Sequence, residues 1–344
     1  MRRRVDRAVH RVKAVRCHAY GPPESLVVDD VPSPVPGPGE VLVSVKAASV
    51  NFPDLLIIEN RYQVKPPLPF SPGCEAAGIV SAVGEGVTRF AKGDRVMAVT
   101  GYGAFAEEIC VPADMAFAVP DEMGNEAASA FLFTYGTAYY ALCDRGRLQR
   151  GETLLVLGAA GGVGVAAIDV GNAVGARVIA CASTDEKLEF CRDRGASNTI
   201  NYATSNLRDE IKRLVGDAGV DVVCDQVGGP HTEAALRSTA WGGRVLVIGF
   251  TAGEIPKIPL NLPLLKGCSI VGVHWGGHIR REPAAFARDV EQLVDWYRKG
   301  LVRPHVERWF PLERVAEALR HVARRSVKGK IVLSIGSGRD QNDD

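Results

Sequence analysis

The hydrophobic pattern of the chain changes character near its middle. Up to about residue 120, short apolar or alternating runs, such as 41–47 and 77–84, are separated by Pro- and Gly-rich stretches at 32–39 and 92–94. Short strands bounded by such turn residues predict a compact, partly open β-barrel. Over about 125–143, apolar and aromatic residues recur at helical spacing, and we expect a helix there that packs into the core.

From about residue 150 to 275, strand and helix patterns alternate. The expected buried strands share short, strongly apolar runs, at 153–157, 176–182, 220–225, 243–249 and 268–273. This alternation is typical of a doubly wound parallel sheet, so the fold class is α/β. A long helix over 283–300, another ending near Arg325 and a terminal strand at 329–333 complete the chain.

A glycine-rich turn follows the first strand of this alternating region. Residues 158–164 contain only Gly, Ala and one Val, and an Ala- and Val-rich helix follows them. Small residues let the backbone approach a pyrophosphate, whose negative charge then lies on the unpaired N–H groups at the helix start. A tight turn without a ligand is the alternative. The strand and helix on either side favour a dinucleotide site.

The end of the second strand bears on the choice of cofactor. An acidic residue there would bind the two ribose hydroxyls of NAD, and the chain has none at that position. Instead, Ser183 can donate to a phosphate and Lys187 can neutralise it. NADP(H) is therefore favoured over NAD(H). Asp185 and Glu186 oppose this inference unless they are first-turn residues of the next helix.

Composition narrows the class of protein. The 344 residues are long enough for about two domains, and 46% hydrophobic with 24% charged residues is ordinary for a soluble enzyme. A formal net charge of +1 gives no indication of nucleic acid or a membrane as partner. We interpret the basic residues 1–7 as a surface extension, with a transit peptide as the alternative, and expect a disordered tail at 339–344.

Cysteine usage gives no indication of a metal cluster. The eight cysteines are scattered and form no C-x-x-C pair. This predicts neither a zinc cluster nor a disulfide framework, and a reducing, cytoplasmic location fits best.

Several motifs together carry a family resemblance. Besides the glycine turn, the chain has Asn51 with Asp54, Gly73-x-Glu75-Ala76-Ala77-Gly78 and Gly93-Asp94-Arg95-Val96. Over about residues 13–335 it resembles the zinc-free quinone oxidoreductase branch of the medium-chain dehydrogenase/reductase superfamily, the relatives of zeta-crystallin. The resemblance implies a Rossmann-type domain inserted in a β-rich GroES-like catalytic domain. It also implies a homodimer.

The expected division is a GroES-like part at 1–130, a Rossmann domain at 131–275 and a return to the catalytic domain at 276–344. In zinc-dependent relatives a Cys, a His and a Cys hold the catalytic metal, and the matching positions here are Asn51, Cys74 and Phe133. Only Cys74 binds zinc well, and a catalytic zinc needs three protein ligands. We therefore predict no metal, and regard Cys74 as a small buried apolar residue.

The resemblance also implies where the cofactor is held. Thr137 is expected near the nicotinamide. Gly249, Phe250 and Thr251 are expected beside the ribose of the nicotinamide. The remaining expected contacts are with phosphates of the cofactor. Those are Gly161, Gly162 and Val163 at the pyrophosphate, Ser183, Lys187 and Tyr202 at the adenosine phosphate, and Lys330 at a cofactor phosphate. Each position also has a purely structural alternative, as a core or surface residue.

Without a metal, hydride donation to an electron-poor carbon remains feasible. Asn51 is the candidate hydrogen-bond donor to nicotinamide or substrate, or else a helix cap before Pro53. Tyr62 either donates a proton or stacks on a flat substrate, or is a half-buried core residue. Asp54 is a structural or a catalytic partner. Leu56 stands where many relatives carry Tyr, so the chain departs here from the family's usual quinone pocket.

We thus expect an NADPH-dependent, zinc-independent oxidoreductase that reduces small electrophiles, either quinones or conjugated C=C bonds such as enones and acryloyl compounds. The alternative is a non-catalytic NADPH-binding protein, as lens crystallins of this kind exemplify. Turnover with an acceptor separates the two.

Overall fold

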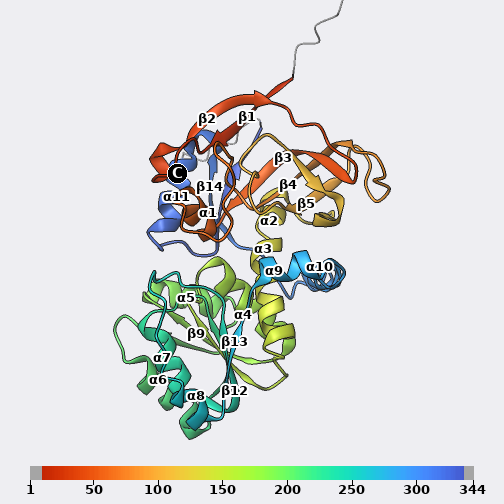
Figure 1. The fold of residues 1–344 in the computed structure, drawn as a ribbon. Coiled ribbons are helices and arrows are strands. Elements are labelled where there is room, and N and C mark those ends of the chain that lie inside the picture. Colours follow the sequence, from red (N-terminus) through yellow and green to blue (C-terminus); the bar gives the residue numbers. More distant parts are fainter. Residues whose placement is uncertain (1–9, 337–344) are drawn as a thin grey trace, which may run out of the picture. The chain divides into compact units, whose positions relative to one another are not determined.

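The computed structural model describes residues 10–336, so the basic segment 1–7 and the tail 339–344 lie outside the described residues. The chain divides into two compact units (Figure 1). The first contains the chain up to Ala130, Arg308–Arg325 and the residues from Ile331 on. The second contains Phe131–Glu307 and Ser326–Lys330.

The expected return to the first unit at residue 276 is wrong, because the chain stays in the second unit until Glu307. Two helices account for the difference, α9 (Trp275–Arg281), which the hydrophobic pattern did not reveal, and α10 (Pro283–Arg298). Both pack with partners of their own unit. Trp275 lies edge-on to Phe133 at 5.3 Å between ring centroids, and Tyr139 contacts Trp296 at 5.5 Å.

The first unit is built on antiparallel strands. A seven-stranded sheet has the order β14–β15–β3–β4–β5–β7 with β6 also paired to β3, and β1 and β2 form a separate ribbon. The strands are β1 (Arg11–Arg16), β2 (Val27–Pro32), β3 (Glu40–Val50), β4 (Glu75–Val83), β5 (Arg95–Val99), β6 (Glu108–Pro112), β7 (Ala116–Ala118), β14 (Val306–Pro311) and β15 (Lys330–Ser334). The long, largely buried β3 lies at the centre and pairs with β4, β6 and β15.

Short helices accompany this sheet. They are α1 (Phe52–Ile58), α2 (Asn125–Ser129), α11 (Val315–Ala323) and the 3-10 turns η1 (Pro23–Ser25), η2 (Ala113–Met115) and η5 (Leu312–Arg314). Close strand packing explains one of the motif glycines. A Cβ at Gly78 would lie 2.2 Å from the carbonyl oxygen of Ser44 on β3, so any side chain there would separate the two strands.

The second unit is a parallel sheet of six strands in the order β10–β9–β8–β11–β12–β13. The strands are β8 (Thr153–Leu157), β9 (Arg177–Ala182), β10 (Asn198–Asn201), β11 (Val220–Asp225), β12 (Thr239–Val247) and β13 (Ser269–Gly272). The strand order reverses between β8 and β11, which is where open α/β sheets bind ligands. The predicted α/β fold, a doubly wound sheet together with a GroES-like β-rich part, is confirmed.

Helices connect these strands. They are α3 (Leu132–Tyr139), a π-helical segment (Tyr140–Arg145), α4 (Gly162–Val174), α5 (Asp185–Asp193), α6 (Leu207–Val215), the 3-10 turn η4 (Gly216–Ala218), α7 (Pro230–Arg237) and α8 (Asn261–Lys266). The single helix expected over 125–143 is wrong. It is broken at Ala130 and Phe131, where Ala130 leaves the helical region with φ −105° and ψ 9°.

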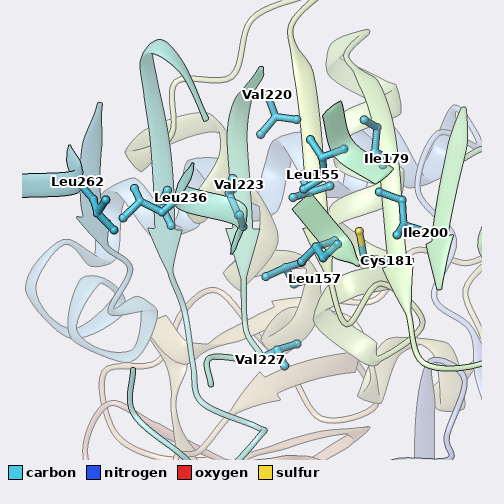
Figure 2. Close-up of a cluster of buried hydrophobic side chains, with 14 residues drawn as sticks. Leu155, Leu157, Ile179, Cys181, Ile200, Val220, Val223, Val227, Leu236 and Leu262 are labelled. Atoms are coloured by element: carbon cyan, nitrogen blue, oxygen red, sulfur yellow. The ribbon is translucent and has the colours of Figure 1, made fainter. Parts of the chain in front are cut away.

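Apolar side chains of the sheet form the core of the second unit. Figure 2 shows Leu155, Leu157 and Val223 from the central strands together with Ile179 from β9, all fully buried. Because both faces of a parallel sheet are covered, such strands have continuous apolar sequences. Their carboxyl ends are thereby fixed next to one another. Within residues 10–336, no helix combines the length and the apolar character that a membrane crossing requires.

Candidate functional site

The glycine turn joins the end of β8 to the start of α4. Gly158 has φ +65°, a conformation that favours glycine, and Gly161 is the N-cap residue of α4. A Cβ at Gly164 would lie 2.4 Å from the carbonyl oxygen of Gly158. Gly164 therefore lets the helix pack directly onto the turn.

Gly161 has no such structural reason to be glycine. Its φ is −76°, and a Cβ there would meet only the carbonyl oxygen of Gly158, at an ordinary 3.5 Å. Neither backbone conformation nor packing within the chain excludes a side chain at this position. The missing side chain instead leaves the first amides of α4 accessible to a ligand, at the positive end of the helix dipole.

A late segment of the chain reaches the same turn. Gly329 N donates to the carbonyl oxygen of Ala160 at 2.8 Å, and a Cβ at Gly162 would lie 2.7 Å from Cδ of Lys330. Lys330 is only 5% exposed. The side chain of Lys330 therefore lies against the first turn of α4.

The ends of β9 and β10 lie beside each other. Asn201 pairs with Ala182 in the parallel ladder, so Tyr202 and Ser183 are the next residues on adjacent strands. Tyr202 also contacts the ring of His231 at 4.4 Å between centroids. Ser183 and Tyr202 are thereby placed together at the carboxyl edge of the sheet, and their contact with the adenosine phosphate of a dinucleotide stays a prediction.

Lys187 belongs to the first turn of α5, whose N-cap Thr184 accepts a hydrogen bond from Lys187 N at 3.3 Å. Burial lowers the pKa of the half-buried Lys187, and the carboxylates of Glu307 and Glu186 oppose this shift. A partly desolvated ammonium favours an anionic ligand nearby. Lys187 thus suits a phosphate.

The two acids near the end of β9 are first-turn residues of α5, so that alternative is confirmed. Both are engaged by other side chains. Asn201 Nδ2 donates to Asp185 Oδ1 at 2.8 Å, and Lys328 Nζ contacts Glu186 Oε1 at 2.7 Å. Neither acid therefore argues for NAD as strongly as an acid at the strand end itself would.

The ends of β11 and β12 are tied to the glycine turn. Gln226 Nε2 donates to the carbonyl oxygen of Gly158 at 3.0 Å, while Thr251 Oγ1 donates to the carbonyl oxygen of Gln226 at 3.0 Å. Gln226 thus joins the ends of three strands, a role that only tertiary structure reveals. Gly249 resembles Gly161, since a Cβ there would meet only an atom at 3.5 Å.

The other cofactor candidates occupy the same unit. Phe250 packs against Gly228, where a Cβ would lie 2.8 Å from the phenyl ring. Phe250 and Val163 are half-buried, and Thr137 lies on α3 with 6% exposure. Their contact with a cofactor stays a prediction.

In the first unit, Asn51 is the N-cap residue of α1, which confirms the capping alternative. Its Nδ2 donates to Glu75 Oε1 at 3.1 Å and to Ser49 Oγ at 3.2 Å. All three residues are at least nine-tenths buried. The amide hydrogens of Asn51 thus have acceptors within the protein, and its role toward a ligand stays a prediction.

Asp54 fixes the entry to α1. One carboxylate oxygen accepts from Asn51 N at 2.8 Å, and the other accepts from Gly73 N at 3.1 Å. Gly73 has φ +93°, and a Cβ there would lie 2.4 Å from the ring of Phe105. The structural role of Asp54 is therefore confirmed.

Tyr62 is half-buried in the loop after α1, and Cys74 is 4% exposed just before β4. Phe133, on α3 in the second unit, is the third position matching a zinc ligand of zinc-dependent relatives. Over residues 10–336, only Asp144, His278 and Asp289 form a group of three or more His, Cys, Asp or Glu side chains that could hold a metal ion. Cys74 belongs to no such group there.

Comparisons with known proteins agree with this geometry. The sequence model of the zinc-binding dehydrogenase family matches residues 162–296, and that of the alcohol dehydrogenase GroES-like domain matches residues 37–121. Quinone oxidoreductase-like protein 2 of Rattus norvegicus is 40% identical over 314 residues, which cover 91% of this chain and 89% of that protein.

Solved structures are similar over nearly the whole chain. Quinone oxidoreductase of Escherichia coli, complexed with NADPH, has a TM-score of 0.88 at 29% identity and covers 94% of this chain and 99% of its own. The enoyl reductase CurK has a TM-score of 0.86 at 25% identity and covers 95% and 100%. Fold and glycine turn together define a medium-chain dehydrogenase/reductase. Within that superfamily, the chain belongs to the zinc-free quinone oxidoreductase branch, a family of oxidoreductases.

Proposed function

We propose that this protein is an NADPH-dependent, zinc-independent oxidoreductase that reduces a quinone or a conjugated C=C bond. The similar Escherichia coli enzyme is a quinone oxidoreductase complexed with NADPH, which supports the cofactor and the first substrate class. The similarity to an enoyl reductase supports the second class. NADPH supplies a hydride when bound.

The observation that carries the proposal is the open backbone at Gly161. A glycine that neither conformation nor packing requires, at the start of α4, leaves the amides accessible for a diphosphate. Lys330, beside Gly162, would add a positive charge there. Ser183, Lys187 and Tyr202 would hold the additional phosphate that distinguishes NADPH from NADH.

In the first unit, we propose that Asn51 and Tyr62 position a small electrophilic substrate. The hydrogen bonds from Asn51 to Glu75 and Ser49 fix its amide in one orientation, which suits a positioning role. The phenol of Tyr62 would stack on a flat acceptor or donate a proton to it.

The direct test is NADPH oxidation by the purified protein with 1,4-quinones, enones and acryloyl compounds, before and after treatment with EDTA. We expect turnover with at least one acceptor class and no effect of the chelator. Zinc-dependent oxidation of a simple alcohol would refute the proposal. Tight NADPH binding without turnover across the panel would favour the non-catalytic alternative.

Replacing Lys187 by alanine is expected to weaken NADPH binding by about 1–2 kcal/mol, because one charged hydrogen bond to phosphate is lost. NADH binding should change little, since NADH lacks that phosphate. Titration calorimetry with both cofactors measures the difference, and Lys212→Ala, on α6, serves as the control. Equal losses for both cofactors would show that Lys187 does not recognise the phosphate.

We further propose a homodimer formed through the edge of the parallel sheet. β13 is the last strand of the sheet, and Ile270 on it is 42% exposed. Trp241 on β12 and Leu264 and Leu265 on α8 are 84%, 77% and 72% exposed. An open edge can pair with its own copy about a twofold axis.

Light scattering of the unmutated protein should give twice the monomer mass. The Ile270→Lys variant should give a lower mass, because a charge is placed on the proposed interface.

A further inference from the structure

We propose that Asp144, His278 and Asp289 form a binding site for one divalent transition-metal ion, such as zinc. The three residues come from three different segments of the second unit, the π-helical segment, α9 and α10. One potential ligand atom from each lies within 4.8 Å of the other two. His278 Nε2 and Asp289 Oδ2 are 3.2 Å apart.

These distances suit a small dication. Ligand atoms bound to tetrahedral zinc at roughly 2.0–2.2 Å lie about 3.4 Å from one another, so separations of up to 4.8 Å would shorten by as much as about 1.4 Å when the ion binds. Imidazole favours zinc and its neighbours in the first transition series, whereas magnesium and calcium prefer oxygen ligands throughout. Three protein ligands would leave one coordination position for water.

The imidazole of His278 is held in place by the residues around it. Its side chain is 3% exposed, and its ring stacks on Tyr140 at 4.1 Å between centroids with a 10° interplanar angle. Nδ1 is buried without a hydrogen-bond partner among residues 10–336. Nε2, the ring nitrogen that faces Asp289, would be the atom that binds the metal.

The site is accessible from solvent on one side. Asp144 is exposed, and a surface pocket of about 380 Å³ is lined by all three residues together with Glu282. Two carboxylates at this separation repel each other, and a bound dication would remove that repulsion. Arg145 and Arg288 also line the pocket and supply part of the compensating charge.

The competing explanation for this cluster is a hydrogen bond between His278 and Asp289 that joins α9 to α10. It accounts for two of the three residues. It does not explain why Asp144, from a third segment, brings a second carboxylate to the same place. The proposed site shares no residue with Asn51, Cys74 and Phe133, so it is independent of the prediction that no catalytic zinc is bound there.

The test is a calorimetric titration of EDTA-treated, dialysed full-length protein with zinc chloride. We expect about one equivalent to bind, with Asp144→Asn weakening binding at least about tenfold because a charged ligand is lost. Glu282→Gln is the matched control, since it neutralises an acid of the same pocket outside the cluster, and should change the affinity by less than about twofold. Asp144 is exposed, so its variant should stay folded.

Cobalt(II) provides a second measurement that identifies the ligands. With nitrogen and oxygen ligands we expect d–d absorption bands without thiolate charge transfer. Absence of zinc binding by the unmutated protein would overturn the proposal, as would equal weakening by Asp144→Asn and Glu282→Gln. Thiolate charge-transfer bands would assign the metal to cysteines and would overturn it as well.

Discussion

Replacing Gly161 by valine is expected to weaken NADPH binding at least 100-fold, or about 2.8 kcal/mol, while the protein remains folded. The branched side chain would cover the first amides of α4, where the diphosphate is proposed to lie. Folding should tolerate the change, because a Cβ at this position meets nothing closer than 3.5 Å. The loss of a favourable N-cap residue costs only about 1 kcal/mol.

Gly124→Val is the matched control. Gly124 is also an N-cap residue, of α2, with a closely similar backbone of φ −70° and ψ 160°. The Gly124→Val protein should lose the same small amount of stability and should bind NADPH as tightly as the unmutated protein does. Fluorescence titration with NADPH, together with thermal unfolding, measures both properties. Unchanged NADPH binding by Gly161→Val would show that the diphosphate does not lie on this turn.

Gly164→Ala separates packing from binding at the same turn. A methyl group there would lie 2.4 Å from a backbone carbonyl oxygen, which cannot move without shifting the end of β8. We therefore expect a clear loss of thermal stability in this variant. Gly161 and Gly164 of the same glycine turn thus have different roles, and only the structure distinguishes them.

The strand-and-helix alternation of the second unit could be predicted from sequence because parallel strands are buried on both faces. The expected run 153–157 is β8, and 220–225 is β11. β12 begins earlier than expected, at Thr239 and not at 243, because the strand also includes Ala240, Trp241 and Gly242, and its register with β11 shifts between Val220 and Val222. Local apolar pattern does not carry that information.

The sequence predicts those residues of the candidate site that directly follow a strand. Ser183 and Tyr202 meet because parallel strands end at one edge of the sheet. The link from Gln226 to Gly158, by contrast, joins positions 68 residues apart in the sequence. Glu75 as acceptor for Asn51 is another such contact. Neither has a local signal, because both depend on how separate elements pack.

The capping box at the start of α1 is a local motif with a large expected effect on stability. Asp54 is 2% exposed, and its two carboxylate oxygens accept from different backbone donors, Asn51 N and Gly73 N. Asparagine at this position could accept only one of these bonds with its single carbonyl oxygen. Its amide nitrogen would face the second donor, which would then be buried without an acceptor.

We therefore expect Asp54→Asn to lower the free energy of unfolding by about 2–4 kcal/mol, combining a lost charged hydrogen bond with an unsatisfied buried donor. Urea unfolding followed by far-ultraviolet circular dichroism measures the change. Asp121→Asn, at an exposed position of the same unit, should shift the free energy by less than about 0.5 kcal/mol. If both variants unfolded at the same urea concentration as the unmutated protein, the two hydrogen bonds of Asp54 would not stabilise the fold.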